Sequence, residues 1–354
     1  MWTPQMLPPT DNIETKRILK SLPKAHAALA ELKGIALSIP NQNILINTLG
    51  LQEAKDSSAV ENIVTTHDEL YKSELNLKSI QSLEAKEVQN YIGALKRGFE
   101  LVSKREMLTS NMILEIQEIL EKNQAGFRKL PGTALKNTIT GETVYTPPQD
   151  FESINSLMTN LEKFINEHEL SDHDPLVKMA VIHFQFESIH PFYDGNGRTG
   201  RIINILYLIL CRLLDLPILY LSSYIIQHKG DYYRLLQDVR DNQNWEDWIL
   251  FMIRSVEKTS IKTIQLILKM KELMLTMKNN LRDNYKFYSQ DLLNNLFKHP
   301  YTKIDFLAKD LGVSRITAAN YLNELSKGQL LEKKKIGMAN YYINKDLFEL
   351  LTQR

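Results

Sequence analysis

Apolar residues recur at intervals of three or four positions along most of the chain, which predicts a mainly helical protein. The longer stripes with this period fall, in chain order, on residues 14–37, 43–49, 88–102, 112–120, 151–170, 175–189, 198–212 and 258–280. Proline removes a helical hydrogen bond, so we expect the first of these helices to break near Pro23. Before residue 287, strong alternation typical of strands occurs only in residues 135–148, around a Thr-Gly turn. The pattern predicts a helical bundle that carries one short β-hairpin.

The last part of the chain, residues 287–354, has a different pattern. Residues 304–325 predict a helix, a glycine turn and a serine-capped second helix, and residues 328–343 predict two strands around a short turn. This order is similar to a winged helix, a module that often binds DNA. Residues 281–354 contain 12 Lys and Arg against 8 Asp and Glu, and Arg315 is nearly alone on the second helix. We therefore expect protein contact or dimerisation more than DNA binding.

A polar loop of twelve residues, 190–201, separates two of the predicted helices and reads His-Pro-Phe-Tyr-Asp-Gly-Asn-Gly-Arg-Thr-Gly-Arg. Gly195, Asn196 and Gly197 are residue types that tolerate positive φ and leave backbone N–H groups uncovered. At a helix N-terminus, such a turn adds free N–H donors to the positive end of the helix dipole. The sequence therefore predicts a site for phosphate or another anion here.

Four side chains in the same loop fit the chemistry of a bound polyphosphate. Arg198 and Arg201 lie three positions apart, so both guanidinium groups can clamp phosphates from the first turn of the helix. Asp194 offers the hard oxygen ligand that Mg²⁺ on a polyphosphate requires, and His190 offers a base that titrates near neutral pH. The alternative is an ordinary connection between helices, with a capping aspartate and two solvated arginines. We favour the phosphate site because all these groups fall within twelve positions.

The loop resembles the signature of the Fic family, His-Pro-Phe-x-Asp/Glu-Gly-Asn-Gly-Arg-x-x-Arg, at every specified position. The resemblance implies a mainly α fold, with a Fic helical bundle, a short β-hairpin flap and a C-terminal winged-helix domain. It also implies transfer of AMP from ATP to a Tyr, Thr or Ser hydroxyl of a protein, with release of pyrophosphate. In that reaction His190 would take the hydroxyl proton, Asp194 would hold Mg²⁺, and residues 195–201 would bind the phosphates.

A second motif, Ser57-x-x-x-Glu61-Asn62, lies well before the loop. Its residue types alone favour a helix that starts near Ser57, with Glu61 in or just beyond the first turn as half of a capping box. The motif also resembles the inhibitory motif of the Fic family, Ser/Thr-x-x-x-Glu-Gly/Asn. That resemblance implies that Glu61 pairs with Arg201 and obstructs the γ-phosphate position, so that a carboxylate and a phosphate compete for one guanidinium.

The predicted hairpin at residues 135–148 has a plain surface loop as its alternative. An exposed hairpin edge can pair with an extended peptide. The resemblance assigns this region to the Fic flap, which would register the target segment. In that case Glu142, Thr143, Val144 and Tyr145 would face the nucleotide.

Two tyrosines further along the chain, Tyr232 and Tyr233, have two interpretations. Apolar residues at helical spacing around them favour burial in the core. The resemblance instead implies that this pair contacts the nucleotide base. Some relatives also place an asparagine eight positions after the first tyrosine to reach adenine, and here that position is Arg240. We expect His183, which lies among apolar residues, to be structural.

Composition adds little to this picture of an ordinary globular protein. The 354 residues are 43% hydrophobic and 24% charged with a net charge of +1, which makes no case for nucleic acid or membrane binding by the whole chain. The single cysteine, Cys211, lies in an apolar stretch that is about half as long as a membrane span. The first residues have neither the basic nor the apolar region of a signal peptide, so we expect a cytoplasmic protein.

We divide the chain into an N-terminal helical region with the inhibitory motif (1–110), a Fic catalytic core (111–255), a helical connector (256–286) and a winged-helix-like domain (287–354). ATP and a protein target, which could be the protein itself, are the expected partners, and a homodimer is left open. Two alternatives remain: transfer of phosphate or another nucleotide by the same fold, and a DNA-binding transcription regulator whose core senses nucleotide. The glycines of the loop argue against phosphate transfer, because Doc-like kinases usually lack this pattern, and His190 argues against pure sensing.

Overall fold

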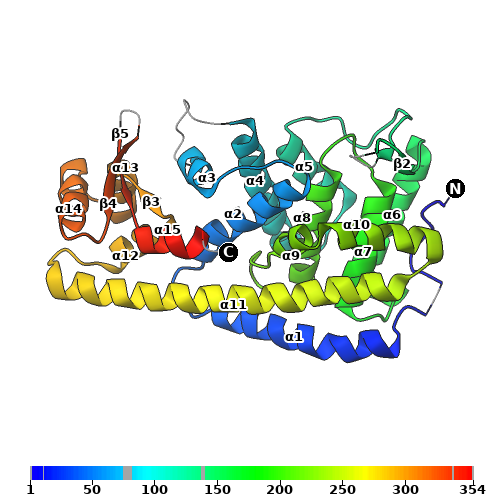
Figure 1. Cartoon of the computed structure of the whole chain (residues 1–354), viewed down its shortest axis with the longest axis horizontal. Helices are drawn as coiled ribbons and strands as arrows, with labels where there is room; N and C mark the ends of the chain where they lie inside the picture. Colours follow the sequence, from blue (N-terminus) through cyan, green and yellow to red (C-terminus); the bar gives the residue numbers. More distant parts are fainter. Residues whose placement is uncertain (1, 11, 75–81, 137–139, 337–338, 353–354) are drawn as a thin grey trace.

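The computed structural model describes residues 2–10, 12–74, 82–136, 140–336 and 339–352. Helices make up most of these residues, and two small antiparallel sheets complete the fold (Figure 1). The prediction of a mainly α protein with a short β-hairpin is therefore confirmed.

The elements follow one another in a simple order. The helices that precede the polar loop are α1 (Lys16–Ala36), α2 (Gln42–Val60), α3 (His67–Glu74), α4 (Leu83–Arg105), α5 (Ser110–Glu121), α6 (Phe151–Asn166), the short 3₁₀ helix η1 (His168–Leu170) and α7 (Pro175–Ile189). Those that follow it are α8 (Asn196–Leu210), α9 (Leu221–Gln227), α10 (Lys229–Asn242), α11 (Trp245–Asn284), α12 (Gln290–Lys298), α13 (Ile304–Leu311), α14 (Arg315–Lys327) and α15 (Lys345–Thr352). The predicted hairpin consists of β1 (Leu135–Lys136) and β2 (Thr143–Tyr145), and the second sheet of β3 (Tyr301–Thr302), β4 (Glu332–Ile336) and β5 (Ala339–Ile343).

Two buried helices, α7 and α8, carry the polar loop between them. Asp174 caps α7 by accepting a hydrogen bond from Leu176 N at 2.8 Å, and Pro175 is the first helical residue, as predicted. Every residue of α7 after Pro175 is buried. Helix α8 begins at Asn196, directly after Gly195, which has a φ of +78°. Burial on all sides therefore fixes both ends of the loop inside the bundle.

The longest helix, α11, runs along the molecule with α1 beside it (Figure 1). The expected break near Pro23 is wrong, because α1 is continuous and contains this proline. Proline costs about 3 kcal/mol inside a helix, whereas each fully buried leucine or isoleucine contributes roughly 1.5–3 kcal/mol. A stripe of buried apolar side chains extends on both sides of the proline and outweighs the local loss. The stripe comprises Ile18, Leu22, Ala25, Ala28, Leu29, Leu32 and Ala36.

Helix α2, which carries the second motif, is longer than expected. The apolar pattern predicts a helix over residues 43–49 alone, but α2 continues through Gly50 to Val60. The alternative in which Ser57 starts a helix is therefore wrong, because Ser57 lies in the last turn of α2 and Glu61 is its C-cap. Glycine inside a helix costs about 0.5–1 kcal/mol. Packing of α2 against α4, α9 and α12 outweighs this cost.

Helices α12 to α15 and the β3–β5–β4 sheet form the C-terminal unit at one end of α11 (Figure 1). As predicted, Gly312 ends α13 with a φ of +65°, and the Ser314 hydroxyl caps α14 by accepting from Thr317 N at 3.1 Å. The unit also contacts α2, because α12 packs on it and Gln52 Nε2 donates to Leu351 O. The helix that carries the second motif thus touches both α8 and the C-terminal unit.

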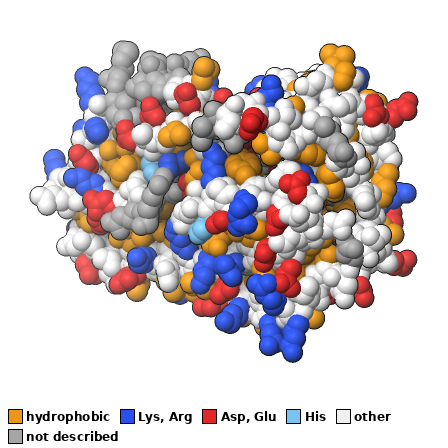
Figure 2. All heavy atoms as spheres, turned by 45° about the vertical axis from the view of Figure 1, so that its right-hand side comes forward, with side chains coloured by type: hydrophobic (Ala, Val, Ile, Leu, Met, Phe, Trp, Pro, Cys, Tyr) orange, Lys and Arg blue, Asp and Glu red, His pale blue; other side chains and the backbone are white. Residues whose placement is uncertain are grey.

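Acidic and basic side chains are interspersed over the face shown in Figure 2, in keeping with the net charge of +1. Among the residues described, no helix combines the length and the apolar character needed to cross a bilayer.

Gly98 tests how tightly the helices around the polar loop pack. A Cβ at this position of α4 would lie 2.6 Å from Leu206 Cδ1 and 3.0 Å from Ile116 Cδ1. We therefore expect Gly98→Val to lower the free energy of unfolding by about 1–3 kcal/mol, the usual cost of overpacking, as measured by chemical denaturation. Gly34→Ala in α1 is the control, because its Cβ meets nothing within 4 Å, and it should be neutral or stabilise by up to about 1 kcal/mol. Equal effects of the two substitutions would contradict tight packing at Gly98.

Candidate active site

The polar loop begins at His190, whose backbone lies in the left-handed region with φ 48° and ψ 59°. Its N–H donates to Phe186 O at 2.9 Å and closes the last turn of α7. The Asn196 side chain closes the other end of the loop. Phe192 N donates to Asn196 Oδ1, and Asn196 Nδ2 donates to Phe192 O, both at 2.8 Å. The side chain of Asn196 therefore shapes the loop.

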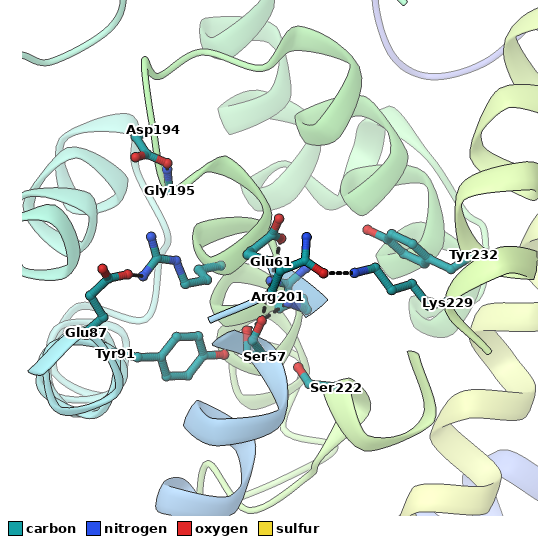
Figure 3. A network of polar contacts seen from close by, with 12 residues as sticks. Ser57, Glu61, Glu87, Tyr91, Asp194, Gly195, Arg201, Ser222, Lys229 and Tyr232 are labelled. Carbon is teal, nitrogen blue, oxygen red and sulfur yellow. Dashed lines mark hydrogen bonds and ion pairs between the residues drawn. The ribbon is translucent and has the colours of Figure 1, made fainter. Parts of the chain in front are cut away.

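Arg201 lies at the centre of the site and is 1% exposed (Figure 3). Its Nε donates to Ser57 Oγ at 2.8 Å, and its Nη2 donates to Ser57 O at 2.9 Å and to Glu61 Oε1 at 2.8 Å. Lys229 lies beside this group of residues and donates to Asn62 Oδ1 at 2.9 Å. The structure thus brings together the two motifs, whose paired residues Glu61 and Arg201 are 140 positions apart in the sequence.

The Glu61 carboxylate lies at the N-terminal end of α8. A Cβ at Gly197 would overlap Glu61 Oε1, so glycine is what leaves room for the carboxylate there. The first N–H groups of a helix lack intrahelical partners and attract anions. The position expected to bind a phosphate therefore already holds an anionic group of the protein.

Arg198 is also buried, and it is paired with two carboxylates. Its Nη1 donates to Glu87 Oε2 at 2.9 Å, and its Nη2 donates to Glu121 Oε1 at 2.8 Å. These glutamates belong to α4 and α5, and they are 111 and 77 residues away in the sequence. Sequence reasoning missed both, because a glutamate on an amphipathic helix carries no local signal of so distant a partner. Both arginines of the loop are therefore neutralised by carboxylates from other helices.

Asp194 is the exposed acid of the loop. Its Oδ1 accepts from Gly195 N at 2.7 Å, and its backbone oxygen accepts from Gln117 Nε2 at 3.3 Å. An accessible carboxylate oxygen is the type of ligand that Mg²⁺ prefers, so the residue fits its predicted role. Over the described ranges, no group of three or more His, Cys, Asp or Glu is arranged to hold a metal ion. The described residues therefore do not form a complete cage for a divalent cation.

Burial and the arginines set the pKa values of the ionisable groups around the loop. Burial acts to raise the pKa of Glu61, but the charges of Arg201, Arg198 and Lys229 and the hydrogen bond from Arg201 together hold this pKa below its usual range. Burial raises the pKa of Glu187 and of Glu53 to about 7. Burial also lowers the pKa of His190 to about 4. The imidazole of His190 is therefore neutral at pH 7 and able to accept a proton.

The two tyrosines of α10 differ in exposure. Tyr232 is 1% exposed, and its hydroxyl lies 2.8 Å from His183 Nε2, while His183 Nδ1 lies 3.0 Å from Asn204 Nδ2. His183 is thus a hydrogen-bonded core residue, in line with the structural role expected of it. Tyr233 is 45% exposed and packs edge-on against Tyr232, with ring centroids 5.1 Å apart. Of the two rings, that of Tyr233 is accessible to a ligand.

The β1–β2 hairpin, the predicted flap, exposes residues 142–144 but turns Tyr145 inward. The Tyr145 hydroxyl donates to Ser188 O at 2.8 Å, two residues before the start of the polar loop. The guanidinium of Arg240 lies 4.1 Å from the centroid of the same ring. Arg240 is therefore buried against the base of the hairpin.

Comparison with protein families agrees with this geometry. The model described as "Fic/DOC family N-terminal" matches residues 19–100, and the one described as "Fic/DOC family" matches residues 107–208. A third, "Protein adenylyltransferase SoFic-like, C-terminal domain", matches residues 270–347. The chain belongs to the Fic/DOC family. The first two matches contain the two motifs that meet at Arg201, so the geometry and the family assignment refer to the same residues.

Curated relatives of this Fic protein include a probable protein adenylyltransferase of Aquifex aeolicus, 29% identical over 163 residues, and a protein adenylyltransferase Fic of Aedes aegypti, 26% identical over 159 residues. Each alignment covers 45% of this chain, with 47% of the first relative and 30% of the second, so the chain spans less than half the length of either.

Solved structures share the fold. A Fic family protein from Desulfovibrio desulfuricans superposes with a TM-score of 0.58 at 20% identity, over 97% of this chain and 98% of that one. Fic-1 from C. elegans superposes with a TM-score of 0.53 at 19% identity, over 73% of each chain. At these identities the likeness establishes the architecture of this Fic protein and not its activity.

Asn196 offers a test of the loop that does not depend on catalysis. We expect Asn196→Ala to lower the free energy of unfolding by about 1–3 kcal/mol, because it leaves two backbone groups of buried Phe192 without their partner. Chemical denaturation of the full chain measures this difference. Asn242→Ala, which removes an exposed hydrogen bond to Asp238, is the control and should change stability by less than about 0.5 kcal/mol. If the Asn196 variant is as stable as the control, its side chain does not hold the loop.

Proposed function

We propose that this Fic protein is a protein adenylyltransferase that moves AMP from ATP to a Tyr, Thr or Ser hydroxyl of a protein target, with Glu61 as its inhibitory residue. The names of the curated relatives support the reaction. The observation that carries the proposal is the contact of Glu61 with Arg201 at the N-terminal end of α8. A protein carboxylate lies there in a site that is built for anions, beside the polar loop with its neutral histidine.

His190 acts as the general base in this proposal. Its imidazole takes the proton of the target hydroxyl while the hydroxyl oxygen forms a bond to the α-phosphorus and the bond to pyrophosphate breaks. With a pKa of about 4, below the near-neutral value expected from its residue type, the imidazole is neutral at pH 7 and has one ring nitrogen without a proton, which can accept the hydroxyl proton. The free N–H groups at the start of α8, together with Arg198 and Arg201, bind the phosphates and stabilise the charge of the transition state.

Asp194 is the residue that would hold Mg²⁺, since its exposed carboxylate lies directly before the turn at Gly195. Mg²⁺ bound there would neutralise charge on the α- and β-phosphates. Phosphate oxygens and water would supply the remaining ligands of such an ion.

Inhibition follows from competition for Arg201. The Glu61 carboxylate and the γ-phosphate are both anions that suit the guanidinium fork, and both require the same end of α8. Glu61 caps α2 rather than lying inside it. Its side chain can therefore leave Arg201 without unfolding the helix that carries it.

Two further contacts concern the nucleotide base and the target protein. We assign contact with the nucleotide base to Tyr233, whose ring is 45% exposed. Tyr232 packs behind this ring. The exposed residues 142–144 of the flap suit main-chain pairing with an extended segment of the target protein. The anchored Tyr145 holds this hairpin against α7.

We infer that the C-terminal unit contacts protein rather than DNA. In α14, Ile316 is 76% exposed, and Arg315 is paired with Asp305 at 2.9 Å. An exposed apolar side chain and a neutralised arginine suit a protein surface better than a phosphate backbone. In a gel-shift titration at roughly physiological salt of 0.15 M, the full-length chain should leave duplex DNA unshifted. Retardation of the duplex that weakens as salt is raised would overturn this inference.

Glu61→Gly tests the reaction and its inhibition together. Loss of a charged hydrogen bond of roughly 1.5–3 kcal/mol predicts a rise of about 10- to 100-fold in the rate of labelling by ATP and Mg²⁺. Intact-mass analysis of protein substrates measures the rate and identifies the added group, which should be AMP.

Glu106→Gly is the matched control, because Glu106 caps α4 with a side chain that is 74% exposed, and it should leave the rate unchanged. Combining Glu61→Gly with His190→Ala or Arg201→Ala should reduce labelling to background. Labelling by the Glu61 variant at the wild-type rate would contradict the inhibitory role. An added phosphate or UMP would contradict the reaction.

A further inference from the structure

Arg128 is a buried arginine outside both motifs, and its guanidinium faces the start of the polar loop. It is 1% exposed. Its Nε donates to His190 O at 2.7 Å, its Nη2 donates to Ile189 O at 3.3 Å, and its backbone N–H donates to Pro191 O at 2.9 Å. Three consecutive carbonyls at the end of α7 thus accept hydrogen bonds from one residue.

The same residue connects the loop to the flap. Arg128 Nη2 also donates to Pro148 O, three residues after the end of β2. The neighbouring Phe127 packs against Phe192 in the polar loop, with ring centroids 5.4 Å apart. The segment before the hairpin therefore holds both the loop and the flap.

The carbonyls near His190 need such a donor for two reasons. The last carbonyls of a helix have no intrahelical partners, and a positive charge near them is favourable to the helix dipole. His190 also has a positive φ, a conformation that costs a non-glycine residue roughly 1–3 kcal/mol and persists only where its surroundings enforce it. Arg128 supplies both the charge and the enforcing contacts.

We propose that Arg128 is the positioning residue of His190, because it holds the carbonyls of residues 189–191 and so fixes the turn from which the imidazole works. The inference rests on the proposed function, in which His190 is the base. A lysine cannot take this role, since one ammonium group lacks the planar fork that reaches several carbonyls at once.

The charge of Arg128 acts on the imidazole as well. Burial is the main cause of the low pKa of His190, and the Arg128 charge lowers it further, with a smaller contribution of the same sign from Arg240 in α10. Glu61 at the end of α2 and the backbone of Glu187 in α7 act in the opposite direction. Activity needs the neutral imidazole and falls as the pH drops through this pKa. Removing the charge of Arg128 should therefore move the acid limb of the pH profile to higher pH.

The test uses the full-length chain with Glu61→Gly, to relieve inhibition, and adds Arg128→Lys or Arg128→Met. Arg128→Lys should lower kcat about 10- to 100-fold, the effect of a misplaced base, and leave KM for ATP within about twofold. Arg128→Met should lower kcat further and shift the acid limb of kcat/KM upward by about 0.5 to 1 pH unit. Arg234→Met is the control, because Arg234 is an exposed residue of α10 that pairs with Asp231, and it should change neither quantity.

NMR titration of the His190 Cε1–H, assigned with His190→Gln, measures the same pKa without catalysis. Arg128→Met should raise this pKa by the same amount as the acid limb. If Glu61→Gly transfers no AMP, the proposed function fails, and the titration still decides the effect of Arg128 on His190. If Arg128→Met keeps the kcat, the acid limb and the His190 pKa of its parent, Arg128 is not the positioning residue. Should Arg128→Met fail to fold, an unchanged kcat in Arg128→Lys would overturn the inference, and a lower kcat with unchanged KM would support it.

Discussion

A buried guanidinium is the constraint on which the site depends. Arg201 is 1% exposed in the middle of the bundle, and an uncompensated charge at such a place costs several kcal/mol. Ser57 and Glu61 supply its acceptors from the end of α2. The charge of Arg201 is therefore neutralised only when the end of α2 packs against α8. In the proposed function, a phosphate that displaces Glu61 must neutralise the same charge.

The two arginines of the loop meet this requirement in different ways. Arg198 is held by two carboxylates, whose side chains are 40% exposed in Glu87 and 12% exposed in Glu121. The side chain of Glu61 is 34% exposed, so water can solvate it when it leaves Arg201. The exposure of Glu61 thus lies between those of the two partners of Arg198.

Several features could be predicted from the sequence because their causes are local. Asp174 and Pro175 start α7 through a side-chain cap and a fixed φ, and Gly195 provides the positive φ that precedes α8. Gly312 and Ser314 separate two helices of the C-terminal unit in the same way. These residues act on their immediate neighbours, so their effect is the same wherever the segment lies.

The sequence by itself determined the helical class of this protein, the composition of the polar loop, the start of α7 and the glycine turn before α8. The tertiary structure decided that α1 continues through Pro23 and α2 through Gly50, because burial against other helices outweighs a local loss of about 0.5–3 kcal/mol. It also decided that Glu121 pairs with Arg198 and that Arg128 holds the end of α7. These contacts join residues that are more than 60 positions apart, so no periodic pattern in the sequence indicates them. They depend on how the helices pack against one another and not on spacing along the chain.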